Sequence, residues 1–121
     1  MDYMRQLDLV HQEKITASST SIIGCGALGS AAAMALAKMG VGQFHLYDDD
    51  GITEVNLPNQ MYKITDINRF KVEALTDIIH GFNNEAVVVP SYRRYTHEQL
   101  PPTVIVTTDT MASRINIWKQ F

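Results

Sequence analysis

Cysteine is nearly absent from this sequence of 121 residues, which also lacks a basic excess. Cys25 is the single cysteine, which excludes an intramolecular disulfide and a cysteine-ligated zinc site within the chain. Ten basic and 13 acidic side chains give a formal net charge of -3, which argues against nonspecific nucleic-acid binding. Only 7 Gly and 4 Pro beside 45% hydrophobic residues exclude collagen-like and disordered classes. We therefore expect one globular domain over residues 1–121.

Export and membrane signals are also lacking. The first eight residues mix charged with apolar side chains, whereas a secretory signal needs an apolar run. Residues 15–37 carry no charge and are long enough to suggest a membrane span. However, hydroxyl side chains crowd the first third of this stretch and three glycines divide the rest, which favours a buried strand, a turn and a buried helix. We expect a cytoplasmic protein that contacts neither membrane nor nucleic acid.

Hydrophobic patterning predicts alternating strands and helices. Strands are expected at 20–23, 43–47, 86–89 and 103–107, and helices within 1–14, at 28–39, at 69–82 and from 110 onward. The last two helices carry apolar side chains at helical spacing: Val72, Leu75, Ile79 and Phe82 in one, Met111, Ile115 and Trp118 in the other. A long functional loop is expected at 51–68. This order favours an α/β fold with a mostly parallel sheet and flanking helices.

Ligands of such sheets bind at the carboxyl ends of the strands. After the first strand, Gly24-Cys25-Gly26-Ala27-Leu28-Gly29 fits the pattern G-x-G-x-x-G. The first glycine permits a tight turn, the second lets the backbone approach a ligand, and the third allows close helix–strand packing. The helix N-terminus offers free N–H groups to an anion. We interpret Gly24, Gly26, Ala27 and Gly29 as a nucleotide-binding turn; the alternative is a glycine turn without a ligand.

Two further sites follow strands, at Asp48-Asp49-Asp50 and at Thr108-Asp109. Asp48 lies about 20 residues after the glycine turn, where an acidic residue accepts hydrogen bonds from ribose hydroxyls. We expect a ribose contact from Asp48 first, from Asp49 second and from Asp50 last. The alternative is a solvated turn, since Asp-Gly is common turn chemistry. On these residues alone, an NAD-dependent dehydrogenase stays open.

Three further parts of the sequence bear on the choice between an NAD-dependent dehydrogenase and other nucleotide-binding proteins. Arg5-Gln6 lies near the start, the segment Asn56-Leu57-Pro58-Asn59-Gln60 follows the acidic run, and Lys71 lies near the start of a predicted helix. Together with the glycine turn, Asp48 and Asp109, this ordered set resembles the ubiquitin-activating-enzyme-like family, the ThiF/MoeB/HesA adenylyltransferases. The family order is Arg-Gln, G-x-G-x-x-G, D-x-D, N-L-x-R-Q, a lysine and a late aspartate. The resemblance covers essentially the whole chain and implies a Rossmann-like, ATP-binding domain.

The resemblance also implies a reaction. The C-terminal glycine carboxylate of a ubiquitin-like or sulfur-carrier protein attacks the α-phosphorus of ATP, pyrophosphate leaves, and an acyl-adenylate forms. Lys71 would neutralise the phosphates, Asp109 would hold Mg²⁺, and Arg5 would reach across a homodimer to the partner's ATP. The remaining motif residues would line the nucleotide site: Asp50, Asn56, Asn59 and Gln60.

The sequence departs from the family pattern at two points. The usual arginine before the final glutamine of the loop motif is Asn59 here, and an amide lacks the charge and bidentate grip of a guanidinium. Arg69, nearby in sequence, is a candidate substitute. The chain is also shorter than family members usually are. It is therefore expected to be a truncated N-terminal half of the family domain, with an open edge strand that dimerisation would cover.

Three functions stay open from the sequence. The first is an adenylyltransferase for a carrier protein. The second is a degenerate module that binds nucleotide or dimerises without turnover, which Asn59 and the short length favour. The third is a fragment of an NAD-dependent oxidoreductase, which leaves Lys71 and the loop motif unexplained. Cys25 lies within the glycine turn, where a small buried residue fits, so no residue is a candidate for thioester formation.

Overall fold

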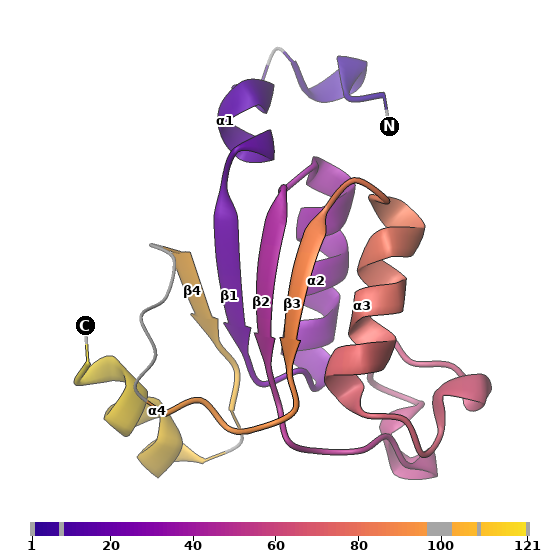
Figure 1. Ribbon diagram of the computed structural model, residues 1–121, viewed down its shortest axis with the longest axis vertical. Helices are drawn as coiled ribbons and strands as arrows, with labels where there is room; N and C mark the ends of the chain where they lie inside the picture. The colour runs from indigo at the N-terminus through magenta and orange to yellow at the C-terminus, as the bar shows by residue number, and fades with distance from the viewer. Residues whose placement is uncertain (1, 8, 97–102, 109, 121) are drawn as a thin grey trace.

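The computed structural model describes residues 2–7, 9–96, 103–108 and 110–120. Its centre is a sheet of four parallel strands in the order β3-β2-β1-β4 (Figure 1). The strands are β1 (Ser19–Ile23), β2 (Gln43–Tyr47), β3 (Val87–Ser91) and β4 (Thr103–Val106). The helices are α1 (Gln12–Thr16), α2 (Ala27–Met39), α3 (Lys71–Phe82) and α4 (Met111–Trp118). The predicted α/β fold with a parallel sheet is confirmed.

Side chains of the central strands divide between the two faces of the sheet, because successive residues point to opposite sides. Ile22 and Leu46 belong to the main core, together with buried residues of α2 and α3. Ile23 and Tyr47 lie on the opposite face and form a small cluster with Ile117 of α4. Figure 1 shows α2 and α3 side by side along one side of the sheet and α4 apart from them beyond the ends of the strands.

The uncharged segment 15–37 has the structure that its glycines and hydroxyl side chains predicted. It contains the end of α1, the whole of β1, the glycine turn and most of α2. Helix α2 ends at Gly40, whose φ of +99° lies in the left-handed region that favours glycine. In the part of the chain that the structure describes, no helix has the length and apolar character needed to cross a bilayer.

Several boundaries differ from those expected. The helix expected from Arg69 begins at Lys71, because residues 51–52 pair with residues 69–70: Ile52 donates to the Arg69 carbonyl at 2.9 Å, and Gly51 bridges Phe70. The loop 51–68 contains two 3-10 turns, Glu54–Asn56 and Ile64–Asp66. Within 1–14 the expected helix is replaced by a 3-10 turn, Met4–Gln6, and the first residues of α1.

The two edges of the sheet are formed by β3 and β4. Strand β3 runs to Ser91, beyond the expected end at Val89, and includes Pro90. An edge strand accommodates proline because one side of the strand has no ladder partner that needs the missing N–H. Among the described strands, β4 pairs with β1 alone, which agrees with the expected open edge.

Candidate functional site

The glycine turn after β1 is tightly packed at two of its glycines and open at the third. Gly24 has a φ of +98°, and a Cβ there would lie 2.8 Å from the Thr107 carbonyl. A Cβ at Gly29 would lie 1.9 Å from the Gly24 oxygen, so α2 approaches the turn too closely for a side chain. At Gly26 the nearest atom is Gln60 Nε2 at 3.8 Å, which leaves space for a ligand. These are the three roles that the motif assigns to its glycines.

The N-terminus of α2 lies at the carboxyl edge of the sheet. Ala27 is its first residue, and Ser30 donates the first intrahelical hydrogen bond, to the Gly26 carbonyl at 2.9 Å. The preceding N–H groups therefore have no intrahelical acceptor. Unpaired N–H groups and the positive end of the helix dipole both favour a phosphate at this position.

Asp48 links the end of β2 to the glycine turn. One carboxylate oxygen accepts a hydrogen bond from the Cys25 N–H at 2.8 Å, and the other accepts one from the Asp50 N–H at 2.8 Å. Burial raises the pKa of Asp48 above its usual range, although both N–H donors favour the charged form. Each oxygen keeps a second lone pair, so the carboxylate can still accept a hydrogen bond from a ribose hydroxyl.

Lys71 is a buried cation beside the acidic run. The residue is 7% exposed, and its ammonium nitrogen lies 3.8 Å from a carboxylate oxygen of Asp50. The Lys71 N–H also donates to the Asp50 carbonyl at 3.0 Å, which fixes the start of α3 against the end of β2. A pocket of about 520 Å³ opens here, lined by residues 50–53, Asn56, Asn68 and Lys71. The structure therefore brings Lys71, Asp50 and Asn56 together at one pocket.

Of the loop motif, Asn56 and Gln60 face the pocket or the glycine turn, whereas Asn59 does not. The Asn56 carboxamide oxygen accepts the Thr53 N–H at 2.9 Å, so Asn56 also holds its own 3-10 turn. Gln60 lies against the glycine turn, and its buried Oε1 has no hydrogen-bond partner within the described chain. A buried polar atom without a partner is costly, so this oxygen fits a site that a ligand completes. Asn59 is exposed.

Arg69 does not serve as the substitute suggested for the missing arginine at position 59. Its guanidinium pairs with Asp66 at 3.0 Å, Glu73 at 3.2 Å and Asp77 at 2.7 Å. The hydrogen bond to Asp77 is the largest cause that raises the pKa of Arg69. Three carboxylates hold this cation beside the first turns of α3, so its role is to fix the loop on the helix.

Of the other two predicted catalytic residues, the structure places Arg5 away from the pocket. Arg5 is exposed in the N-terminal 3-10 turn, where the neighbouring Gln6 donates to the Met39 carbonyl at 2.8 Å. Met39 ends α2, so Arg5 lies at the opposite end of the sheet from the glycine turn (Figure 1). Asp109, the predicted magnesium ligand, lies outside the described residues.

Tyr62, in the loop after β2, binds the glycine turn, a contact that the sequence analysis did not predict. Tyr62 is 5% exposed, and its hydroxyl donates to the Cys25 carbonyl at 2.6 Å. This bond fixes the loop after β2 over the glycine turn. The only sequence signal for it is a tyrosine within the predicted loop, whose hydroxyl needs a hydrogen-bond partner when it is buried. Burial raises the pKa of the Cys25 thiol far above its usual range, which agrees with a structural cysteine.

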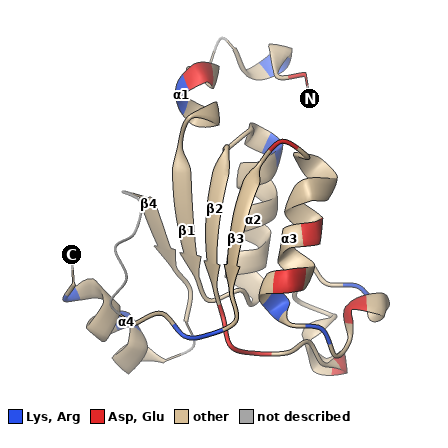
Figure 2. Cartoon of the chain, viewed as in Figure 1, with Lys and Arg blue, Asp and Glu red and all other residues tan. Residues whose placement is uncertain are grey.

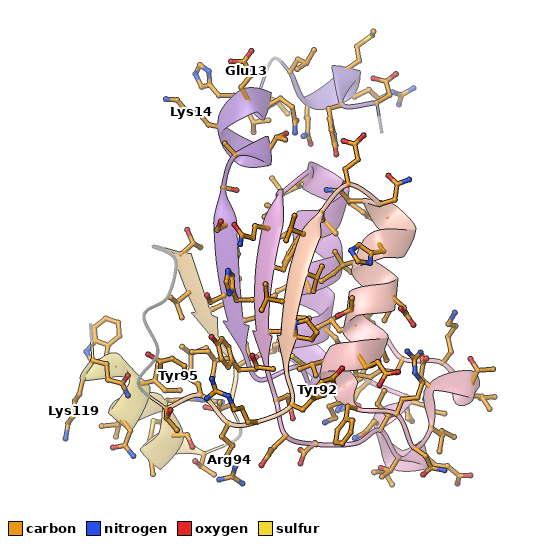
Figure 3. The ribbon with its side chains drawn as sticks, viewed as in Figure 1. Glu13, Lys14, Tyr92, Arg94, Tyr95 and Lys119 are labelled. Atoms are coloured by element: carbon orange, nitrogen blue, oxygen red, sulfur yellow. The ribbon has the colours of Figure 1, made fainter. Side chains whose placement is uncertain are left out.

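Basic and aromatic side chains of the segment after β3 contact the same edge. Arg94 donates through Nε to an Asp49 oxygen at 3.0 Å, and Tyr92 packs on Phe70 with ring centroids 5.1 Å apart. Tyr95 meets Tyr47 edge-on at 5.5 Å. Figure 2 shows the basic segment after β3 close to the acidic segment after β2, and Figure 3 shows Arg94 between the two labelled tyrosines. This segment therefore packs against the residues at the carboxyl ends of β2 and against Phe70 before α3.

The acidic run is also a possible cation site. Asp48, Asp49 and Asp50 each offer a carboxylate oxygen, and these oxygens lie within 4.8 Å of one another. Carboxylate oxygens are suitable ligands for Mg²⁺. Asp48 and Asp49 are engaged by N–H groups and Arg94, whereas the carboxylate of Asp50 is 62% exposed at the pocket. Asp50 is therefore the carboxylate of the run that is most open to a cation at the pocket.

Fold and edge together define a Rossmann-like domain with a glycine turn at the carboxyl ends of its strands. The model of the ThiF family matches residues 2–118, and the chain belongs to this family. The sulfur carrier protein ThiS adenylyltransferase of Escherichia coli is 34% identical over 97% of this chain. The adenylyltransferase and sulfurtransferase uba4 of Aspergillus clavatus is 31% identical over 90% of it. The chain spans only 51% of the former protein and 24% of the latter.

Solved structures agree with this assignment. Escherichia coli MccB superposes with a TM-score of 0.81 at 25% identity, over 87% of this chain and 32% of that one. A structure of the same protein with ATP gives a TM-score of 0.65 at 29% identity, over 67% and 25%. The Escherichia coli tRNA N6-threonylcarbamoyladenosine dehydratase TcdA, at 23% identity and a TM-score of 0.83, shows the shared fold over 88% of this chain and 48% of that one.

Proposed function

We propose that this chain is the ATP-binding part of an adenylyltransferase that activates the C-terminal glycine carboxylate of a sulfur-carrier or ubiquitin-like protein. The observation that carries the proposal is the arrangement of Lys71, Asp50 and Asn56 around one pocket, which Asp48 links to the glycine turn through its hydrogen bonds with the Asp50 and Cys25 N–H groups. A dinucleotide-dependent oxidoreductase has no need of a buried lysine there. The names of the relatives, which include a ThiS adenylyltransferase and the uba4 proteins, support the same reaction.

The proposed chemistry is an in-line substitution at the α-phosphorus of ATP. A carboxylate oxygen of the carrier forms a bond to phosphorus, the bond to the bridging oxygen breaks, and pyrophosphate leaves with its electron pair. The N–H groups of the glycine turn and α2 would bind phosphate oxygens, Lys71 would balance the negative charge, and Asp48 would hold the ribose. Little covalent help is required, because positioning and charge stabilisation supply most of the rate.

Magnesium fits this donor set through carboxylate oxygens. Asp50 would hold Mg²⁺ in the pocket, and Asp109 would be its second ligand. When bound, the ion would neutralise charge that develops on pyrophosphate. Asp50 would then exchange part of its interaction with Lys71 for the metal, which leaves the ammonium available to the phosphates.

Binding of Mg·ATP to the wild type, Lys71→Met and Lys14→Met by calorimetry tests the site. Met keeps the packing of a buried aliphatic stem and removes the charge, so we expect affinity to fall roughly 10- to 100-fold, the value of a charged hydrogen bond. Lys14 lies at the far end of the sheet in Figure 3, and its variant should bind like the wild type. Equal affinity of all three proteins would contradict the proposed phosphate site.

Turnover is tested by exchange of labelled pyrophosphate into ATP in the presence of a sulfur-carrier protein that ends in glycine. A carrier without its terminal glycine is the matched control, because it removes the attacking carboxylate from its place. Exchange with the first carrier only would support the adenylyltransferase. Nucleotide binding without any exchange would favour the second candidate, a module that binds nucleotide without turnover, for which the exposed Asn59 is the specific observation.

We also propose that the active form is a homodimer in which Arg5 serves the partner's site. Arg5 lies at the end of the sheet opposite its own pocket, and among the described strands β4 has a neighbour on one side only. Sedimentation at micromolar concentration checks the assembly. A stable monomer that still performs exchange would contradict this part of the proposal.

A further inference from the structure

Arg94 is a cation of the carboxyl edge with unused hydrogen-bond donors. Its Nε donates to Asp49 at 3.0 Å, and its side chain is 82% exposed. Among the described residues, its two terminal nitrogens have no hydrogen-bond partner. Arg69 is engaged by three carboxylates, and Lys71 is buried against Asp50. Arg94 therefore presents a guanidinium that is oriented by one carboxylate and still free at its planar end.

The order of the strands indicates which part of a nucleotide Arg94 faces. The turn after β1 fits phosphates, and Asp48 after β2 fits the ribose. The sheet order places β3 next to β2, on the side away from β1. Arg94 follows β3 and contacts Asp49, the neighbour of Asp48. Continuing the same direction beyond the phosphates and the ribose leads to the nucleobase.

The surroundings of Arg94 suit a flat aromatic ligand. Tyr92 and Phe70 are half-exposed, lie 5.1 Å apart and are tilted by 55°. Tyr95 is anchored on Tyr47 on the other side of Arg94. These ring contacts attach the segment at both ends, and Figure 3 shows Arg94 projecting away from the sheet between them. A planar guanidinium in this position can stack on a base and donate to ring nitrogens.

We propose that Arg94 is a nucleobase-binding residue, held by Asp49 so that its guanidinium packs on the purine of the bound nucleotide. The inference rests on the proposed function for the identity of the nucleotide but concerns the base alone. It gives Asp49 a defined part as the residue that orients Arg94.

The test is calorimetric binding of adenosine, ATP and tripolyphosphate to the wild type, Arg94→Gln and Arg94→Lys. We expect both variants to lower the affinities for adenosine and for ATP by the same factor, roughly three- to tenfold, because stacking of a base on a cation contributes modestly to binding. Tripolyphosphate binding should not change. Lysine keeps the charge but not the plane, so full rescue by Arg94→Lys would overturn the proposal, as would a loss confined to ATP.

Two further variants separate base binding from simple charge balance. Asp49→Asn keeps an acceptor for the Arg94 Nε but removes the negative charge that the arginine neutralises. If Arg94 binds the base, Arg94→Gln still weakens the binding of adenosine when it is combined with Asp49→Asn. An unchanged affinity for adenosine in that double variant would overturn the proposal. Arg114→Gln removes the same charge from α4, where Arg114 donates to the Thr108 carbonyl, and should leave adenosine binding unchanged.

Each result also distinguishes this inference from the proposed function. Adenosine binding that depends on Arg94, without pyrophosphate exchange, would sustain the inference and contradict the adenylyltransferase. Exchange that proceeds with an unaltered adenosine affinity in Arg94→Gln would do the reverse. A wild-type protein that binds neither adenosine nor ATP would overturn both.

Discussion

Helices α3 and α4 carry apolar side chains at the same helical spacing, yet the chain buries only one of the two faces. In α3, Leu75 and Ile79 are fully buried against the sheet. In α4, Met111 and Ile115 are exposed, and Trp118 is 79% exposed. Helix α4 instead turns Ile117 toward the sheet, where it joins a much smaller cluster than the one under α3.

Periodicity therefore predicts an amphipathic helix but not the surface that covers its apolar face. Helix α3 lies between β2 and β3 in sequence, so the sheet that covers it is within the same segment of chain. Helix α4 follows β4, an edge strand with a neighbour on one side only among the described strands.

The comparison is tested most strongly by matched truncations. Leu75→Ala removes a fully buried side chain, and we expect a loss of about 2–5 kcal/mol in the free energy of unfolding. Ile115→Ala should change that free energy by less than about 0.5 kcal/mol, because its side chain already contacts water. Urea denaturation followed by circular dichroism measures both. If Ile115→Ala costs as much as Leu75→Ala, the face of α4 is covered in solution, and the cost should then depend on protein concentration.

The glycine turn offers the same contrast between a packed and an open side. Gly29→Ala places a Cβ 1.9 Å from the Gly24 carbonyl oxygen, so α2 must shift, and we expect about 1–3 kcal/mol of destabilisation. Gly26→Ala meets no atom closer than 3.8 Å, so it should cost less than Gly29→Ala while weakening ATP binding. Thermal unfolding and calorimetry on the same samples check the pair. Retained ATP affinity in Gly26→Ala would show that the open side is not the ligand side.

Much of the fold was predictable because it depends on local sequence. The glycine turn, the uncharged strand and the termination of α2 at Gly40 all follow from residues within the segment itself. The start of α3 was not, since Arg69 and Phe70 are drawn into pairing with residues after β2. Such tertiary pairing overrides helix preference and leaves no periodic signal.

The candidate site follows the same division. Asp48, Lys71 and Asn56 stand in the ordered motif, and the structure places them around the turn and the pocket. The suggestion that Arg69 replaces the missing arginine at position 59 was wrong, because its guanidinium is paired with three carboxylates. The Arg94–Asp49 and Tyr62–Cys25 contacts join residues far apart in sequence, so only the folded chain reveals them.

A smaller change in stability is expected from the titration of Asp48, which follows β2 at the carboxyl ends of the strands. Its folded-state pKa is raised, mainly by burial, above the unfolded value. The folded state therefore binds the proton more tightly, so this group lowers stability as pH rises through the interval from the unfolded pKa to the folded one. Ordinary carboxylates with depressed pKa values act in the opposite direction, which makes the sign diagnostic.

The measurement is the free energy of unfolding of the wild type and Asp48→Asn between pH 3.5 and 7. We expect the wild type to lose stability relative to Asp48→Asn as pH rises through the titration of Asp48, and the difference to level off above it. Asp77→Asn is the control, because that carboxylate is paired with Arg69 and its loss should not reproduce this trend. A difference of opposite sign would mean that the Cys25 and Asp50 N–H donors outweigh burial, and that Asp48 is held ionised ready for a ribose.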